Sequence, residues 1–254
     1  YQNSASQTFT KNNLFIGTDY YFSPEDVYVA DIDSDGSLDV VSASYHDDRI
    51  SWHKNIPPYS GPVWYVSTTG SDSNEGSANE PFATIQAGIN AASSGDTVSV
   101  AAGTYAENVA LENPDGGPFK SINVIGEDKN TTVIDGGQSG AAFRVQRNPH
   151  LLLKNFTIQN GTGFESAGGA VNLSGADGSS RTAVLENLIL KNNSGGAVWA
   201  TSSDVTIKNS SIESNTNSNF GGGVYVTNCI KLTLDDVVVK NNTANQGGGV
   251  YVDN

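Results

Sequence analysis

The fold is decided by a short motif that recurs through the second half of the chain. It reads Gly168-Gly169-Ala170-Val171, Gly195-Gly196-Ala197-Val198, Gly221-Gly222-Gly223-Val224 and Gly247-Gly248-Gly249-Val250. Successive valines of the motif are 27, 26 and 26 residues apart. A period in the twenties without helical apolar spacing is typical of a β-solenoid, in which each repeat forms one coil and buries its apolar side chains against the next coil.

A second motif lies between the glycine motifs. It reads Leu153-Lys154-Asn155-Phe156-Thr157-Ile158-Gln159-Asn160, and its counterparts begin at Leu185, Ile207 and Leu234. Strands bounded by asparagine turns explain this pattern, with the apolar positions filling a narrow core. We expect the residues at the third position to stack as a ladder at one corner and to satisfy turn backbone. These residues are Asn155, Asn187, Asn209 and Asp236.

The charged residues of the second motif support this alignment of the coils. The position before each ladder residue is occupied in turn by Lys154, Glu186, Lys208 and Asp235. The signs alternate, so that neighbouring coils would place opposite charges about 4.8 Å apart.

The beginning of the solenoid also has a recognisable sequence. Residues 83–92 have helical apolar spacing, which predicts a short helix that covers the first coil. The first full strands are expected between Asp96 and Tyr105. No capping segment is evident after the last coil, so we expect an uncapped end there.

Residues 63–254 resemble the right-handed parallel β-helix proteins of the pectate-lyase-like superfamily, both from Trp64 to Tyr105 and in the Gly-Gly-x-Val coils. The glycine and asparagine turns also resemble those of autotransporter passengers. The resemblance implies an all-β protein with a parallel β-helix over residues 64–254. Lyases, hydrolases, adhesins and phage fibres share this fold, so the fold does not choose among these functions.

Residues 57–63 are rich in proline and glycine and predict a linker that separates the solenoid from residues 1–56. The preceding segment contains short β runs and an acidic loop. Oxygen atoms at alternate loop positions suit calcium, and we expect the ligands to be Asp31, Asp33, Asp35, Asp39 and the carbonyl of Ser37. An EF-hand is excluded because Ser42 stands where the twelfth loop position requires glutamate.

The residues around this loop, from Val27 to Ala43 and from Ile50 to Asn55, resemble one FG-GAP/VCBS repeat. The resemblance implies a small antiparallel β blade. A lone blade leaves both of its edges unpaired, which predicts a partner for it.

Catalytic residues are not evident. The best basic cluster is Arg144, Arg147, His150 and Lys154. The candidate carboxylates, which share no register, are Asp115, Asp135, Glu165 and Asp177. We interpret the basic cluster as ordinary solvated charge and place the carboxylates in turns, and we assign no catalytic residue. Polysaccharide hydrolysis would need paired carboxylates from adjacent coils.

The amino-acid composition argues against some classes of binding partner. The chain has 27 acidic and 13 basic residues, for a net charge of −14, which argues against nucleic acid and anionic membranes. Its 254 residues contain one cysteine, so an internal disulfide is excluded. We expect a secreted or cell-surface protein of a prokaryote that does not insert into a membrane.

The sequence therefore favours a non-catalytic structural or adhesive β-solenoid that associates head to tail or through its blade. The alternatives are a polysaccharide lyase or glycoside hydrolase of the β-helix class and a carbohydrate-binding module. The predicted partner-binding stripe is the aromatic row Trp199, Tyr225 and Tyr251, because each ring follows an inward valine and must point outward.

Overall fold

The computed structural model describes residues 24–32, 38–44, 49–53, 63–112, 119–146, 150–163, 168–174, 181–229 and 231–253. Contacts divide the chain into two compact units, Tyr1–Tyr59 and Ser60–Asn254. The division between the units, after Tyr59, falls inside the predicted linker of residues 57–63. The predicted domain boundaries at residues 56 and 64 stay predictions.

The first unit contains a three-stranded antiparallel sheet in the order β1-β2-β3. Its strands are β1 (Pro24–Ala30), β2 (Asp39–Ser44) and β3 (Arg49–His53). This small antiparallel sheet confirms the predicted β blade as a fold element. The β run expected at residues 8–16 lies outside the described residues.

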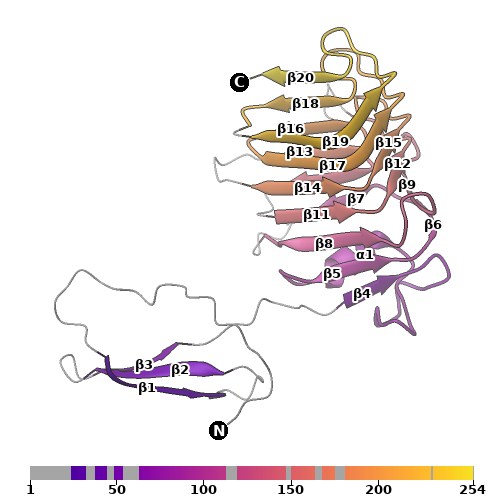
Figure 1. The fold of residues 1–254 in the computed structure, drawn as a ribbon. Helices are drawn as coiled ribbons and strands as arrows, with labels where there is room; N and C mark the ends of the chain where they lie inside the picture. Colours follow the sequence, from indigo (N-terminus) through magenta and orange to yellow (C-terminus); the bar gives the residue numbers. More distant parts are fainter. Residues whose placement is uncertain are drawn as a thin grey trace. The chain divides into compact units, whose positions relative to one another are not determined.

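The second unit is a parallel β-helix in which successive coils stack along one axis (Figure 1). A six-stranded sheet forms one side of the coils, in the order β7-β10-β13-β16-β18-β20. Its strands are β7 (Val109–Leu111), β10 (Phe143–Gln146), β13 (Val171–Ser174), β16 (Val198–Thr201), β18 (Val224–Thr227) and β20 (Val250–Asp253).

The remaining strands form two further sides of the coils. One side contains β4 (Val63–Val66), β5 (Thr97–Val100), β8 (Ile122–Gly126), β11 (His150–Lys154) and β14 (Thr182–Glu186). The other contains β6 (Gly103–Ala106), β9 (Thr132–Asp135), β12 (Thr157–Gln159) and β15 (Ile189–Lys191). The long strands β17 (Asp204–Glu213) and β19 (Leu232–Lys240) continue from one side into the other.

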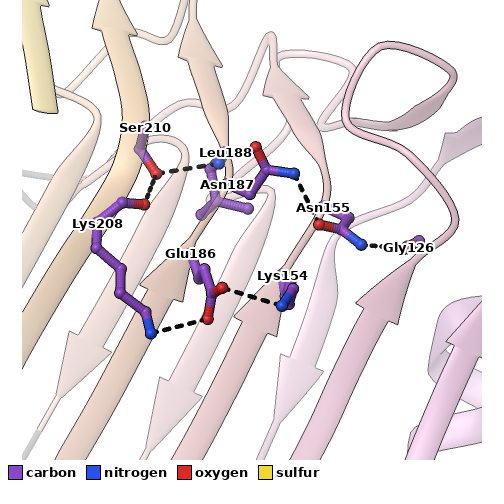
Figure 2. Close-up of polar contacts among 8 residues, drawn as sticks. All are labelled: Gly126, Lys154, Asn155, Glu186, Asn187, Leu188, Lys208 and Ser210. Atoms are coloured by element: carbon purple, nitrogen blue, oxygen red, sulfur yellow. Dashed lines mark hydrogen bonds and ion pairs between the residues drawn. The ribbon is translucent and has the colours of Figure 1, made fainter. Parts of the chain in front are cut away.

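The corner between these two sides is made by the third residue of the second sequence motif. Asn155, Asn187, Asn209 and Asp236 all have a positive φ, between 50° and 65°. Asparagine tolerates this left-handed conformation better than most residues, which explains its recurrence there. The Asn187 Nδ2 donates to Asn155 Oδ1 at 2.8 Å, and the Asn155 Nδ2 donates to the Gly126 carbonyl at 3.0 Å (Figure 2). The ladder is thus confirmed from Gly126 to Asn187.

The alternating charges meet as predicted. The Glu186 carboxylate lies between two lysines, 2.9 Å from Lys154 Nζ and 3.1 Å from Lys208 Nζ (Figure 2). Asp235 pairs with Lys208 in the register of β17 and β19. Hydrogen bonds from the two lysines hold the pKa of Glu186 below its ordinary value of 4.5.

Replacing Glu186 with glutamine is expected to lower the free energy of unfolding by about 0.5 to 1 kcal/mol at pH 7, as for other partly exposed ion pairs. Because the folded-state pKa is depressed, the carboxylate stabilises the fold above the unfolded-state pKa. This contribution is lost as the pH falls through the lowered pKa. Thermal unfolding at pH 7 and along an acid series measures the effect. A difference between the two proteins that persisted undiminished in acid would contradict this account.

A second asparagine ladder runs inside the coils, where the sequence analysis did not place one. Asn193 and Asn215 are 1% and 0% exposed. The Asn193 Nδ2 donates to Asn215 Oδ1, and the Asn215 Nδ2 donates to Asn242 Oδ1, both at 2.9 Å. At one end, Asn193 Oδ1 accepts the backbone N–H of Gly161. These side chains link successive coils through a buried corner.

The predicted short helix is present as α1 (Ile85–Ala91). Thr84 caps it, with Oγ1 accepting the N–H of Ala87 at 3.1 Å. The helix packs on β4, β5 and β7 and buries Ile85 and Ile89. A Cβ added at Gly88 would lie 2.8 Å from Val98, so the helix approaches the strands closely.

Candidate functional site

The outward face of the six-stranded sheet carries a row of side chains that runs along the β-helix axis. The register pairs these residues from strand to strand in the order Arg144, Asn172, Trp199, Tyr225 and Tyr251. The valines before the last three behave differently, because Val198 and Val224 are buried while Val250, on the outermost described strand, is 37% exposed. The structure therefore brings the predicted aromatic residues into one row, and their role in binding stays a prediction.

A second outward row lies two residues further along each strand. Its members in the register are Gln146, Ser174, Thr201, Thr227 and Asp253. Three of them are hydroxyl residues on β13, β16 and β18, beside Asn172, Trp199 and Tyr225. The central part of this face therefore combines aromatic rings with groups that can both donate and accept hydrogen bonds.

The three rings of the predicted row do not all contact one another. Tyr225 and Tyr251 meet edge to face, with centroids 5.5 Å apart and planes at 65°. Phe220 completes the cluster, since it stacks on Tyr251 at 4.8 Å and lies 5.7 Å from Tyr225. Trp199 is the next residue of the row and takes part in none of these three ring contacts.

Phe220 is a member of this cluster that was not predicted from the sequence. Its only signal is its place directly before Gly221, where the equivalent residue of the next coil is Gln246. Asn217 holds this loop, because its Nδ2 donates to the carbonyls of Phe220 and Gly195 at 2.6 and 3.1 Å. Asn217 is 7% exposed, so the loop that carries Phe220 is anchored in the coil.

Tyr225, within the aromatic cluster, is also close enough to Asp253 of the second row to feel its charge. Burial, and after it the negative charge of Asp253, raises the pKa of the Tyr225 phenol. A phenol O–H can donate a hydrogen bond.

The other end of the face is formed by β7 and β10. Arg144 Nε lies 2.6 Å from Glu112 Oε1, and the two side chains are 49% and 22% exposed. A groove of about 220 Å³ adjoins this pair, and its lining residues are Asn108, Val109, Ala110, Ser139, Gly140, Ala141 and Arg144. Asn108 fixes the groove wall by donating from Nδ2 to the Gly136 carbonyl at 3.1 Å.

The residues considered for catalysis are dispersed. Arg144 pairs with Glu112, Lys154 pairs with Glu186, and His150 Nδ1 lies 2.7 Å from Thr182 Oγ1. Arg147, Asp115, Glu165 and Asp177 lie outside the described residues.

The Asp135 carboxylate is held by hydrogen bonds from neighbouring residues. Burial acts to raise the pKa of Asp135, but hydrogen bonds from Gln159, the Gly137 N–H and Asn160 outweigh it and lower the pKa. Another carboxylate, Glu107, accepts the N–H groups of Ile85 and Gln86 at the start of α1. Burial raises the pKa of Glu107 despite these hydrogen bonds.

The predicted calcium ligands are only partly described. Asp33, Asp35 and Ser37 lie outside the described residues. Asp39 is fully buried, and its Oδ2 accepts the N–H of Ile32 at 3.2 Å, whereas Asp31 is exposed. Within the described part of the chain, no three His, Cys, Asp or Glu side chains gather as a metal site would require.

The β-helix is similar to a known protein family. A family model described as "Pel9A-like, right handed beta helix region" matches residues 64–224. The chain belongs to this Pel9A-like family. The match supports the predicted right-handed parallel β-helix. Among the described residues, no helix is long and apolar enough to cross a membrane.

Individual relatives were also found. The uncharacterized protein YwoF of Bacillus subtilis (strain 168) is 30% identical over 139 residues, which are 51% of this chain and 29% of YwoF. A rhamnogalacturonan lyase shares 17% identity over 75% of this chain and 62% of its own, with a TM-score of 0.36. The GH136 lacto-N-biosidase from Eubacterium ramulus shares 18% identity over 73% and 34%, also at 0.36. The chain spans less than two thirds of the length of each of these relatives.

Proposed function

We propose that this Pel9A-like protein is a non-catalytic, adhesive β-solenoid that binds an extended polysaccharide along the outward face of its six-stranded sheet. The observation that carries the proposal is the in-register row of Asn172, Trp199, Tyr225 and Tyr251. Strands of a sheet are about 4.8 Å apart, so the row offers binding groups at a regular interval along the axis. Sugar rings repeat at a similar interval along an extended chain.

The chemistry of the face fits a carbohydrate. The apolar C–H face of a sugar packs against an aromatic ring, and its hydroxyls pair with amide and hydroxyl side chains. Trp199 and Tyr225 supply rings, and Thr201 and Thr227 supply hydroxyls on the same strands. Trp199, Tyr225 and Tyr251 are half-buried, so part of each ring is open to a ligand, and contiguous apolar area on a surface often marks a contact site.

Replacing Trp199 with alanine is expected to weaken polysaccharide binding about fivefold or more, because a ring contact contributes about 1 kcal/mol. Trp199 is the most specific residue to test, since it lies outside the cluster of Phe220, Tyr225 and Tyr251 and its replacement should affect stability least. Tyr225→Ser should weaken binding as well, and it should also lower the melting temperature because Tyr225 packs on Phe220 and Tyr251.

The binding assay is isothermal titration calorimetry or affinity electrophoresis with cellulose oligosaccharides, mannan, xylan, polygalacturonate and alginate. Tyr65→Ser is the matched control, because Tyr65 is an exposed aromatic residue on β4 rather than on the six-stranded sheet. Unchanged binding by a folded Trp199→Ala variant would overturn the proposal. Release of shorter sugar products during incubation would instead identify a lyase or a hydrolase.

We also propose that the first unit binds one calcium ion through Asp31, Asp33, Asp35, Asp39 and the Ser37 carbonyl, because these residues place oxygen atoms at alternate positions of the acidic loop. The position of Asp39 supports this, since the buried carboxylate accepts the N–H of Ile32, next to Asp31 at the start of the acidic loop. Those residues would hold the ion, which would neutralise their mutual repulsion.

The double variant Asp33→Ala, Asp35→Ala is expected to lose calcium binding in calorimetry, because it removes two carboxylate ligands. Asp26→Ala is the control, since Asp26 is exposed in the same sheet and hydrogen-bonds locally to the N–H of Val27. Chelation should leave the melting of the β-helix unchanged. Calcium binding by the double variant equal to that of the parent would show the assignment to be wrong.

A further inference from the structure

On the described strands of the proposed binding face, the charges are confined to the two ends. The outward residues of the three central strands are all uncharged, and they are Asn172, Ser174, Trp199, Thr201, Tyr225 and Thr227. The charged residues are Arg144 and Glu112 at the β7–β10 end and Asp253 on β20. A sugar chain lying across the middle of the face would meet only neutral groups.

Among the described residues of this face, the one cation is already engaged. Arg144 Nε lies 2.6 Å from Glu112 Oε1, so the guanidinium has a carboxylate partner within the protein. A uronate carboxylate would have to compete with Glu112 for Arg144, or else lose water without gaining an ionic partner. Glu112 and Asp253 together outnumber Arg144, so the described outward face carries a small negative charge.

We infer, on the basis of the proposed function, that the face selects a neutral polysaccharide and discriminates against its uronate-containing counterpart. The discrimination comes from two causes: uronates find no free cation on the three described central strands, and they are repelled by Asp253 and by the net charge of −14 on the chain. Neutral sugars lose no affinity through the lack of a free cation or through the negative charge, because stacking on Trp199 and hydrogen bonding to Thr201 require no charge.

The experiment compares one ligand in two charge states. The neutral glycan that binds best among cellulose oligosaccharides, mannan and xylan is oxidised at a primary hydroxyl to the uronate, which leaves its linkage unchanged. Affinities of the parent protein for oligosaccharides of equal length are then measured by calorimetry at low and at high salt. We expect the neutral form to bind at least tenfold more tightly at low salt. The ratio should narrow at high salt, because salt screens the repulsion.

A pair of variants tests the stated cause. Glu112→Gln releases Arg144 from its carboxylate partner and should increase the ratio of uronate affinity to neutral affinity about threefold or more. Asp253→Asn should shift uronate affinity in the same direction through the other end of the face. Glu213→Gln is the control, because it removes a carboxylate of the same chain that pairs with Lys240 away from the six-stranded sheet.

The outcomes separate the two proposals. Uronate binding equal to or tighter than neutral binding would overturn the selectivity and leave polysaccharide binding intact. A protein that binds none of the glycans, or whose binding ignores Trp199→Ala, would overturn the proposed function itself. Selectivity that survived both Glu112→Gln and Asp253→Asn unchanged would overturn the electrostatic cause.

Discussion

Replacing Asn215 with alanine is expected to lower the free energy of unfolding of the β-helix by about 3 to 5 kcal/mol. The side chain is fully buried and makes hydrogen bonds in both directions along the axis. Its Oδ1 accepts the backbone N–H and the Nδ2 of Asn193, and its Nδ2 donates to the Leu190 carbonyl and to Asn242 Oδ1. Alanine would leave these buried partners unpaired, and each such group costs about 1 to 3 kcal/mol.

The matched control for Asn215 is Asn209→Gly in the same coil. Asn209 is exposed and has φ 53°, a conformation that glycine adopts without strain. Its replacement should change the free energy of unfolding by less than about 1 kcal/mol. Denaturant unfolding followed by circular dichroism measures both variants. If Asn215→Ala cost no more than Asn209→Gly, the inner ladder would not hold the coils together.

Replacing Gly169 with alanine should destabilise the fold by about 3 kcal/mol or more. A Cβ at this position would overlap the Ser194 carbonyl oxygen and would lie 2.7 Å from the Gly161 carbonyl oxygen. Both neighbours are backbone atoms, Ser194 in the next coil and Gly161 in the turn that leads to Gly169 itself, so they cannot move aside as a flexible side chain could. Expression as soluble protein and the melting temperature report the loss.

Gly137→Ala provides the comparison for Gly169. Gly137 has φ 57°, but a Cβ there would meet no atom within 4 Å. The expected cost is therefore only that of a left-handed alanine, about 1 to 2 kcal/mol. Equal destabilisation by the two substitutions would mean that backbone conformation, rather than close approach of the coils, explains the glycine motif.

The features that could be predicted from the sequence are those that repeat in every coil. The spacing of Val171, Val198 and Val224 fixes the coil length, and strand alternation then places Trp199 and Tyr225 outward. The alternating Lys154, Glu186 and Lys208 confirm this register through their ion pairs.

The inner ladder and Phe220 could not be predicted, because each depends on a position beside a turn that the repeat leaves ambiguous. In Asn192-Asn193 the first residue has φ 56°, and the second is buried in the inner ladder. Two identical residues in succession do not reveal which one takes the turn and which one enters the core. Phe220 could not be predicted because the equivalent position of the next coil is Gln246, so the aromatic residue does not recur with the repeat.

The inner asparagine ladder has a direction that coincides with the direction of synthesis. Asn193 depends on an acceptor supplied by Asn215, and Asn215 depends on one supplied by Asn242. A coil therefore completes its own buried amide only when the following coil is in place, because the accepting asparagine lies 22 or 27 residues further along the chain. Removal of a later coil would leave the buried amide of the coil before it without its acceptor.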